Sequence, residues 1–300
     1  MQFGMCVPHY GKPVNIAQTL DVARGAEAMG FDSVWVTDHL LVPRTFEIIY
    51  RDNMLEPIAL LSHLAAVTQR VRLGTSVIIL PYRHPITVAK MLATIDQLSG
   101  GRLIFGAAVG WMEEEFRALG QPHAERGVMS DEHLRLIRAL WTSEVVSFAG
   151  KYTHFTDMQA SPRPVQQPHP PIWIGGNSRR AQRRVAELGD GWHATGAAPA
   201  DIAAGRTYIQ QRWSQHQRAG QPRLSLRMGL FIDGVSELAV SYPSRGRLTM
   251  QGSVPQIVDT IGAYQEAGIE HVVLEMSTQT HDSILRTMET VMQSIKPQVM

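Results

Sequence analysis

The stretch PIWIGGNSRRAQRRVAELGDGWHAT, residues 171–195, decides the fold class. It begins with a short apolar strand, Pro171–Gly176, continues with a helical pattern from Arg179 to Leu188, and ends in a second strand, Gly191–Thr195. A strand, a helix and a second strand in this order form a right-handed βαβ unit whose two strands are parallel. The stretch therefore indicates an α/β protein built around a parallel sheet.

The same alternation extends along the chain in both directions. Further strands are expected at Gln2–Val7, Ser33–Thr37, Val71–Leu80, Leu103–Gly110, Leu224–Ile232 and His271–Met276. Further helices are expected at about Asn15–Met29, Leu55–Thr68, Pro85–Ser99, Asp131–Leu140, Pro199–Arg218, Val254–Ala267 and Ser283–Ser294. Eight strands alternating with eight helices predict one (β/α)8 barrel domain over residues 1–300, and an open doubly wound sheet is the alternative.

Four segments interrupt this rhythm and are expected to be insertions at the C-terminal face of the barrel. They span about 40–55, 111–129, 145–170 and 233–252. In the third segment, VVSFAGKYTHF alternates around a Gly-Lys turn and predicts a β-hairpin. The following SPRPVQQPHPP is too rich in proline for a regular helix or strand.

The composition narrows the class of protein. The formal net charge of +1 gives no strong electrostatic attraction to nucleic acid or to an anionic membrane. The single cysteine, Cys6, excludes a disulfide framework and favours a reducing compartment. We see no charged leader at the N-terminus and no apolar run near the ~20 residues of a membrane helix, so a cytoplasmic protein is expected.

In a barrel of this kind the active site lies at the C-terminal ends of the strands, and Asp38 and His39 directly follow the second strand. A carboxylate beside an imidazole can form an acid–base or ligand-binding pair, because histidine titrates near neutral pH. The structural alternative is that Asp38 caps a loop and His39 packs. The 12 histidines are scattered without metal-ligand spacing, so no metal site is expected.

The residues Gly175, Gly176, Asn177 and Ser178 lie between a strand and a helix. Two glycines let the backbone approach an anion, two polar side chains can donate hydrogen bonds, and a helix N-terminus supplies N–H groups and partial positive charge. This pattern is typical of a phosphate site. The alternative is a tight turn before a basic helical face, to which we assign the later arginines, Arg183 and Arg184.

Two further stretches contain unusual residues. Thr75 and Ser76 place hydroxyl groups inside the apolar run 71–80. In GWMEEEFRALG, residues 110–120, Gly110 lets a ligand ring pass and Trp111 can stack on it. For the acidic run Glu113–Glu115 we prefer helix-terminus electrostatics over catalysis.

Together GFDSVWVTDHL, LGTSVIILPYRHP, LSGGRLIFGAAVGWMEEEFRALG and PPIWIGGNSRRAQRRVAELGDGWHATG resemble the luciferase-like flavin and deazaflavin oxidoreductases. The resemblance covers residues 30–195 and is greatest to the single-domain members that use coenzyme F420. It implies a (β/α)8 barrel that holds a flavin-like ring at the strand C-termini, and a homodimer.

The resemblance also assigns residues. It implies a cis peptide bond at Ser76–Val77, beside Thr75, that supports the ring from behind. It implies that His39 is the catalytic acid or base and that Asp38 hydrogen-bonds the ring system. The remaining cofactor contacts that it implies are Val109 and Gly110 beside the ring, and Gly175, Gly176, Asn177 and Ser178, with Thr195 nearby, at the phosphate.

Two departures from the family pattern concern the substrate. Sugar-phosphate dehydrogenases of the superfamily carry a glutamate where this chain has Trp111, and a tryptophan shortly after the histidine where it has Leu41, Val42 and Pro43. These changes argue against a sugar phosphate and leave His39 as the recognisable proton donor. An apolar or aromatic lining is suggested by Trp111, Phe46, Tyr50 and Phe155.

Three functions stay open at this point. The first is hydride transfer between reduced F420 and a small, apolar or aromatic organic substrate, with His39 supplying or accepting the proton. The second is an FMN-dependent monooxygenase, in which the reduced flavin reacts with oxygen. The third is a carrier that binds a flavin without catalysis, against which the Asp38-His39 pair argues.

Overall fold

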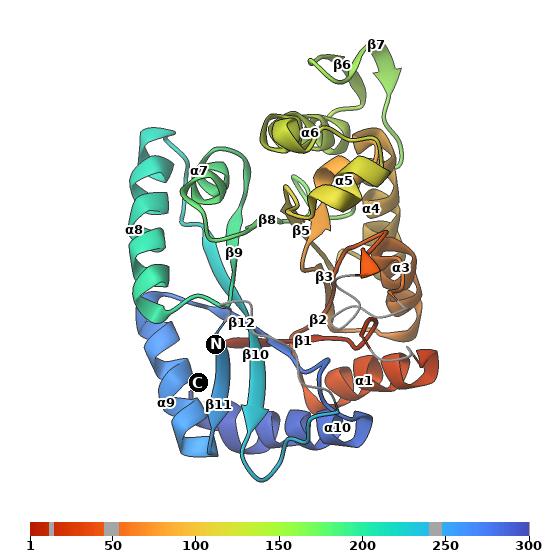
Figure 1. Ribbon diagram of the computed structural model, residues 1–300. Helices are drawn as coiled ribbons and strands as arrows, with labels where there is room; N and C mark the ends of the chain where they lie inside the picture. The colour runs from red at the N-terminus through yellow and green to blue at the C-terminus, as the bar shows by residue number, and fades with distance from the viewer. Residues whose placement is uncertain (12–14, 45–53, 240–247, 300) are drawn as a thin grey trace.

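The computed structural model describes residues 1–11, 15–44, 54–239 and 248–299, and its parallel strands close into a barrel (Figure 1). In barrel order the strands are β1 (Gln2–Cys6), β2 (Ser33–Val36), β3 (Arg72–Thr75) with β4 (Ile78–Ile79), β5 (Leu103–Ala108), β8 (Ile172–Gly175), β9 (Gly191–Thr195), β10 (Arg223–Ile232) and β12 (His271–Glu275). Each strand pairs with the next, and β12 pairs with both β10 and β1. The predicted (β/α)8 barrel is therefore confirmed.

Amphipathic helices cover the outside of the strands (Figure 1). They are α1 (Ile16–Met29), α3 (Pro57–Val67), α4 (Pro85–Ser99), α6 (Arg126–Thr142), α7 (Arg179–Leu188), α8 (Pro199–Gln215), α9 (Val254–Ala267) and α10 (His281–Thr290). Helix α1 shows the local rules: Asn15 accepts a hydrogen bond from the Gln18 N–H, and Gly30 ends the helix with a φ of 89°. The main hydrophobic core fills the layer between helices and strands.

The insertions are partly as predicted. The hairpin is confirmed, since β6 (Val145–Ala149) and β7 (His154–Gln159) are antiparallel and lie outside the barrel next to α6 (Figure 1). The segment 233–252 is not all loop, because Thr249–Gly252 forms β11 beside β10. Its four residues, of which Met250 alone is a large apolar side chain, carry little strand signature, so the pairing depends on the overhanging end of β10.

Two predicted boundaries are wrong. The run 71–80 is not one strand, because Ser76 and Val77 separate β3 from β4 and Leu80–Tyr82 form a 3-10 turn. Helix α6 begins at Arg126, five residues before the predicted start at Asp131. A 3-10 turn, His123–Glu125, leads directly into it, and no side chain caps its N-terminus, so the usual start signal is missing.

Inside the barrel lies a buried aromatic and polar cluster rather than an aliphatic one. The Trp35 ring stacks on His193 at 5.1 Å and on Trp173 at 5.5 Å between ring centroids. His193 is hydrogen-bonded to Ser76 and Ser225, and His271 to Ser33. Burial lowers the pKa of His193 to about 3, with Arg227 contributing, and burial lowers the pKa of His271 to about 3 as well.

These two histidines predict instability in acid. Between pH 6.5 and about 3 the unfolded chain binds a proton on each imidazole that the native barrel does not bind. Lowering the pH through this window therefore lowers the free energy of unfolding by about 1.4 kcal/mol per pH unit for each histidine. Urea unfolding of the wild type and of His271→Gln across this window measures the effect. The variant should show the shallower slope, and equal slopes would contradict the prediction.

Candidate functional site

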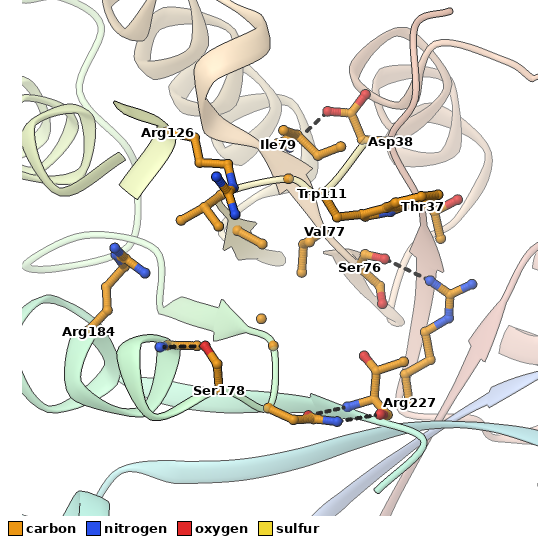
Figure 2. Close-up of a pocket in the computed structure, with 18 of the residues that line it drawn as sticks. Thr37, Asp38, Ser76, Val77, Ile79, Trp111, Arg126, Ser178, Arg184 and Arg227 are labelled. Atoms are coloured by element: carbon orange, nitrogen blue, oxygen red, sulfur yellow. Dashed lines mark hydrogen bonds between the residues drawn. The ribbon is translucent and has the colours of Figure 1, made fainter. Parts of the chain in front are cut away.

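A pocket of about 980 Å³ opens at the C-terminal ends of the barrel strands, where the sequence placed the active site (Figure 2). Most of the predicted residues lie on its wall. They are Asp38, His39, Ser76, Val77, Val109, Gly110, Trp111, Gly175, Gly176, Asn177, Ser178 and Thr195. The structure thus brings the ends of β2, β5, β8 and β9 to one cavity.

His39 lies just beyond β2 and is held by Glu115 of the short helix α5 (Glu113–Ala118). The His39 Nδ1 atom is 2.7 Å from Glu115 Oε2, and both side chains are buried. The Trp111 ring and the imidazole are nearly perpendicular, at 82°, with 5.9 Å between their centroids. His39 lines the pocket and its Nδ1 is bonded to Glu115, so Nε2 is the ring nitrogen left for proton exchange with a ligand.

The prediction for the acidic run is wrong for Glu115. Glu113 and Glu114 are exposed at the start of α5, as helix-terminus electrostatics requires, but Glu115 is 1% exposed. Successive helical residues point about 100° apart, so three adjacent glutamates cannot share one face. Glu115 falls on the inner face together with Phe116. The sequence did contain a signal for this burial, because Glu115 is followed directly by the apolar Phe116.

Asp38 is fixed by protein groups. Its carboxylate accepts hydrogen bonds from Arg83 at 2.6 and 2.9 Å. It also accepts one from the Ile79 N–H at 2.9 Å (Figure 2). The Asp38 side chain has no exposed surface and that of Arg83 is 11% exposed. Asp38 therefore anchors the chain after the bulge, and its carboxylate already has partners where the resemblance implied a contact with the ring.

The bulge between β3 and β4 has the predicted cis peptide bond at Ser76–Val77. The Ser76 carbonyl accepts a hydrogen bond from Arg227 at 2.9 Å, and its Oγ is hydrogen-bonded to His193 (Figure 2). Thr75 lies behind the pocket wall, where its hydroxyl bonds the backbone of Gly106 at 2.7 and 2.9 Å. A Cβ on Gly106 would lie 1.8 Å from the backbone carbonyl oxygen of Thr75, so glycine is required there.

A cluster behind the bulge was missed by the sequence analysis. Arg227 of β10 forms an ion pair with Glu275 of β12 and bonds Tyr10 at 2.9 Å. Glu275 also accepts hydrogen bonds of 2.6 Å from Tyr10 and from Ser277. An arginine inside the apolar strand LSLRMGLFI and a glutamate at the end of HVVLEM were the available signals, since a charged residue in a buried strand needs a partner.

The loop between β8 and α7 forms a cradle. Gly176 has a φ of 106°, and a Cβ on Gly175 would lie 2.8 Å from Val77. Ser178 caps α7 by accepting a hydrogen bond from the Ala181 N–H at 3.2 Å, so its own hydroxyl proton can be donated. Both polar atoms of the Asn177 side chain bond the backbone of Thr195, so Asn177 shapes the cradle.

Positive charge surrounds this cradle. The arginines on the pocket wall are Arg126, Arg180, Arg183, Arg184 and Arg227. Arg183 and Arg184 share Asp131 as an ion-pair partner, but Arg184 is buried, so it does not belong to the solvated basic face that the sequence suggested. Arg180 lies in the first turn of α7 and Arg126 at the start of α6, and within the described residues neither has a carboxylate partner. Glycines, helix N–H groups and these arginines together suit a phosphate group.

The residues predicted to contact the substrate lie only partly within the described ranges. Trp111 is 42% exposed and lines the pocket, as predicted. A Cβ on Gly110 would lie 2.7 Å from the Ile79 side chain, so glycine at this position lets Ile79 pack against the backbone. Phe46 and Tyr50 lie outside the described residues. Phe155 does not line the pocket, because it stacks on Phe148 across the hairpin.

Within the described ranges, no three histidine, cysteine or acidic side chains are grouped so as to hold a metal ion. No helix in the same ranges has the length and apolar character needed to cross a membrane.

Comparison with solved structures shows the same fold. A monooxygenase from Streptomyces bottropensis, RslO1, superimposes with a TM-score of 0.84 at 20% identity over 100% of both chains. An F420-dependent secondary alcohol dehydrogenase, solved with an F420–acetone adduct, gives a TM-score of 0.83 at 20% identity over 100% of this chain and 99% of that one.

Sequence comparison gives nearer relatives. An uncharacterized protein of Mycobacterium tuberculosis is 35% identical over 216 residues, which are 67% of this chain and 76% of that protein. The FMNH2-dependent dimethylsulfone monooxygenase of Pseudomonas putida is 36% identical over 156 residues, covering 51% of this chain and 43% of that protein. The model of the luciferase-like monooxygenases matches residues 1–245, and the chain belongs to this family.

Proposed function

We propose that the protein is an oxidoreductase that uses reduced coenzyme F420 for hydride transfer to or from a small, uncharged, apolar or aromatic substrate. The observation that carries this proposal is that His39, paired with Glu115, lies on the wall of the pocket that also contains the phosphate cradle. Such a pair can exchange a proton beside a bound cofactor, and a family of this kind uses flavins or deazaflavins.

The residues of the pocket fit a flavin-like group. Gly175 and Gly176 leave room that a side chain would fill, and the first turn of α7 offers N–H groups to a phosphate. Val77 at the bulge and Val109 with Gly110 at the end of β5 supply walls for a flat ring system. When bound, reduced F420 supplies a hydride equivalent, the chemistry that no side chain of the protein can provide.

The protein's own part in the reaction is the proton. A hydride and a proton together add two hydrogen atoms across a polar double bond, so reduction of the substrate needs one proton from the protein. His39 can deliver it from Nε2 when the imidazole is protonated on both nitrogens, because Nδ1–H stays bonded to Glu115 and Nε2 is left to give up its proton. In the oxidative direction the same nitrogen accepts the proton from the substrate hydroxyl.

The preference for F420 over FMN rests on the volume of the pocket and the charge on its wall. F420 has a longer polar tail than FMN, with acidic groups beyond its phosphate. The volume of about 980 Å³ is at the upper end of the usual range for ligand pockets, and Arg126 and Arg180 add positive charge to the pocket wall. Both features support the larger anionic cofactor.

The second candidate is an FMN-dependent monooxygenase. It is favoured by the 36% identity to the dimethylsulfone enzyme and by a cradle that suits a single terminal phosphate. In that case His39 would supply or accept a proton during oxygenation of the substrate.

Titration of the purified protein with F420 and with FMN, followed by cofactor fluorescence, separates the candidates. We expect F420 to bind at least about tenfold more tightly, a difference of about 1.4 kcal/mol. Tighter binding of FMN would favour the monooxygenase, and binding of neither would contradict both. Binding of F420 without turnover of any acceptor would favour a carrier.

A further inference from the structure

The carboxylate of Glu115 has four hydrogen-bond donors and no exposed surface. Its Oε1 atom accepts from the backbone N–H groups of Leu40 and Leu41. Its Oε2 atom accepts from His39 Nδ1 at 2.7 Å and from the Tyr82 hydroxyl at 2.8 Å. The two oxygens therefore have different roles, because Oε1 holds the loop after β2 and Oε2 faces the imidazole.

A carboxylate with four donors stays ionised. Burial raises the pKa of the Glu115 carboxyl, but the hydrogen bonds from His39, Leu41 and Leu40 outweigh burial and hold it below its ordinary value. An ionised carboxylate accepts hydrogen bonds and donates none, so the hydrogen in the contact with His39 belongs to Nδ1. The neutral imidazole then carries its lone pair on Nε2.

We propose that Glu115 is a positioning residue that fixes the tautomer of His39, so that Nε2, the nitrogen not bonded to Glu115, carries the lone pair and is the proton-accepting atom. The catalytic role of this tautomer rests on the proposed function. Its structural content, the tautomer itself, is independent of any cofactor. A general base needs its lone pair on the nitrogen that meets the substrate, and the wrong tautomer presents an N–H there instead.

Glu115→Gln is the informative substitution because a glutamine side chain has the same shape with one oxygen. That oxygen is expected to stay on the N–H groups of Leu40 and Leu41, as Oε1 does now. The amide NH₂ then faces His39 and donates to Nδ1. The hydrogen of the neutral imidazole must move to Nε2, so the substitution inverts the tautomer without removing the loop contacts.

The ¹⁵N NMR spectrum of histidine-labelled protein without cofactor, recorded well above the ordinary titration range of histidine, measures the tautomer directly. In the wild type we expect the Nδ1–H form of His39, identified by its loss in His39→Ala. In Glu115→Gln we expect the Nε2–H form. The matched control is Glu114→Gln, which removes the same charge from the exposed neighbour and should leave the wild-type signal.

An Nε2–H tautomer in the wild-type protein would overturn the proposal, and this measurement needs only the assignment variant His39→Ala to fold. An unchanged tautomer in folded Glu115→Gln would overturn it as well, because Glu115 would then act through packing alone. With F420 and a substrate, Glu115→Gln should lower kcat by about 10²-fold or more while KM and cofactor affinity stay the same. If the tautomer inverts but no protein variant turns over F420, the proposed function fails and the positioning role stands.

Discussion

His39→Ala is expected to lower kcat by about 10²–10⁴-fold, the usual contribution of a positioned acid or base. The affinity for the cofactor is expected to stay the same, because the phosphate cradle and the bulge do not include His39. The measurement is steady-state turnover of F420 with a substrate, together with a fluorescence titration of cofactor binding on the same variant.

The control is His63→Ala, which removes an exposed imidazole from α3, far from the pocket wall. It should leave both kcat and binding at wild-type values. Wild-type turnover in His39→Ala would remove this residue from the mechanism. A parallel loss of cofactor affinity would show that His39 holds the ring, which contradicts the separation of proton transfer from cofactor binding in the pocket.

Asp38→Ala is expected to lower the free energy of unfolding by about 3–5 kcal/mol, as measured by urea denaturation. The substitution leaves the Arg83 guanidinium buried beside a lost partner and removes the acceptor of the Ile79 N–H. Glu56 still pairs with Arg83 at 2.6 Å and so offsets part of the loss. The offset is only partial because the Glu56 side chain is 38% exposed and its charge is screened by solvent.

The double variant Asp38→Ala with Arg83→Met tests the physical cause. Removing both charges takes away the unpaired guanidinium, so the double variant should lose less stability than the sum of the two single variants. Additive losses would show that the pair is not coupled and that Asp38 stabilises the bulge through the Ile79 N–H alone.

The barrel could be predicted because its signals are local and repeated. Each βα unit carries its own apolar strand and its own helix ends, such as Asn15 and Gly30 around α1. The cradle was predictable for the same reason, since glycines followed by Ser178 at a helix start are adjacent in the chain. The cis peptide at Ser76–Val77 came from resemblance, and no local rule for a β-strand predicts it.

The contacts that complete the site depend on residues far apart in the chain. Glu115 lies 76 residues from His39, and Arg227 lies 151 residues from Ser76. A single sequence shows that a buried charge needs a partner but does not say which partner the fold will bring. The fold places α5 over the end of β2, and that placement turned Glu115 from a helix-terminus charge into the partner of the imidazole.

Anaerobic mixing of the protein with reduced F420 and a panel of small, uncharged apolar and aromatic acceptors tests most directly whether the pocket transfers hydride. We expect the visible absorbance of oxidised F420 to return in the absence of oxygen, and to return far more slowly with His39→Ala. The contradicting result is reduced F420 that stays unchanged with every acceptor, while reduced FMN is consumed only when oxygen is admitted and an oxygenated product forms.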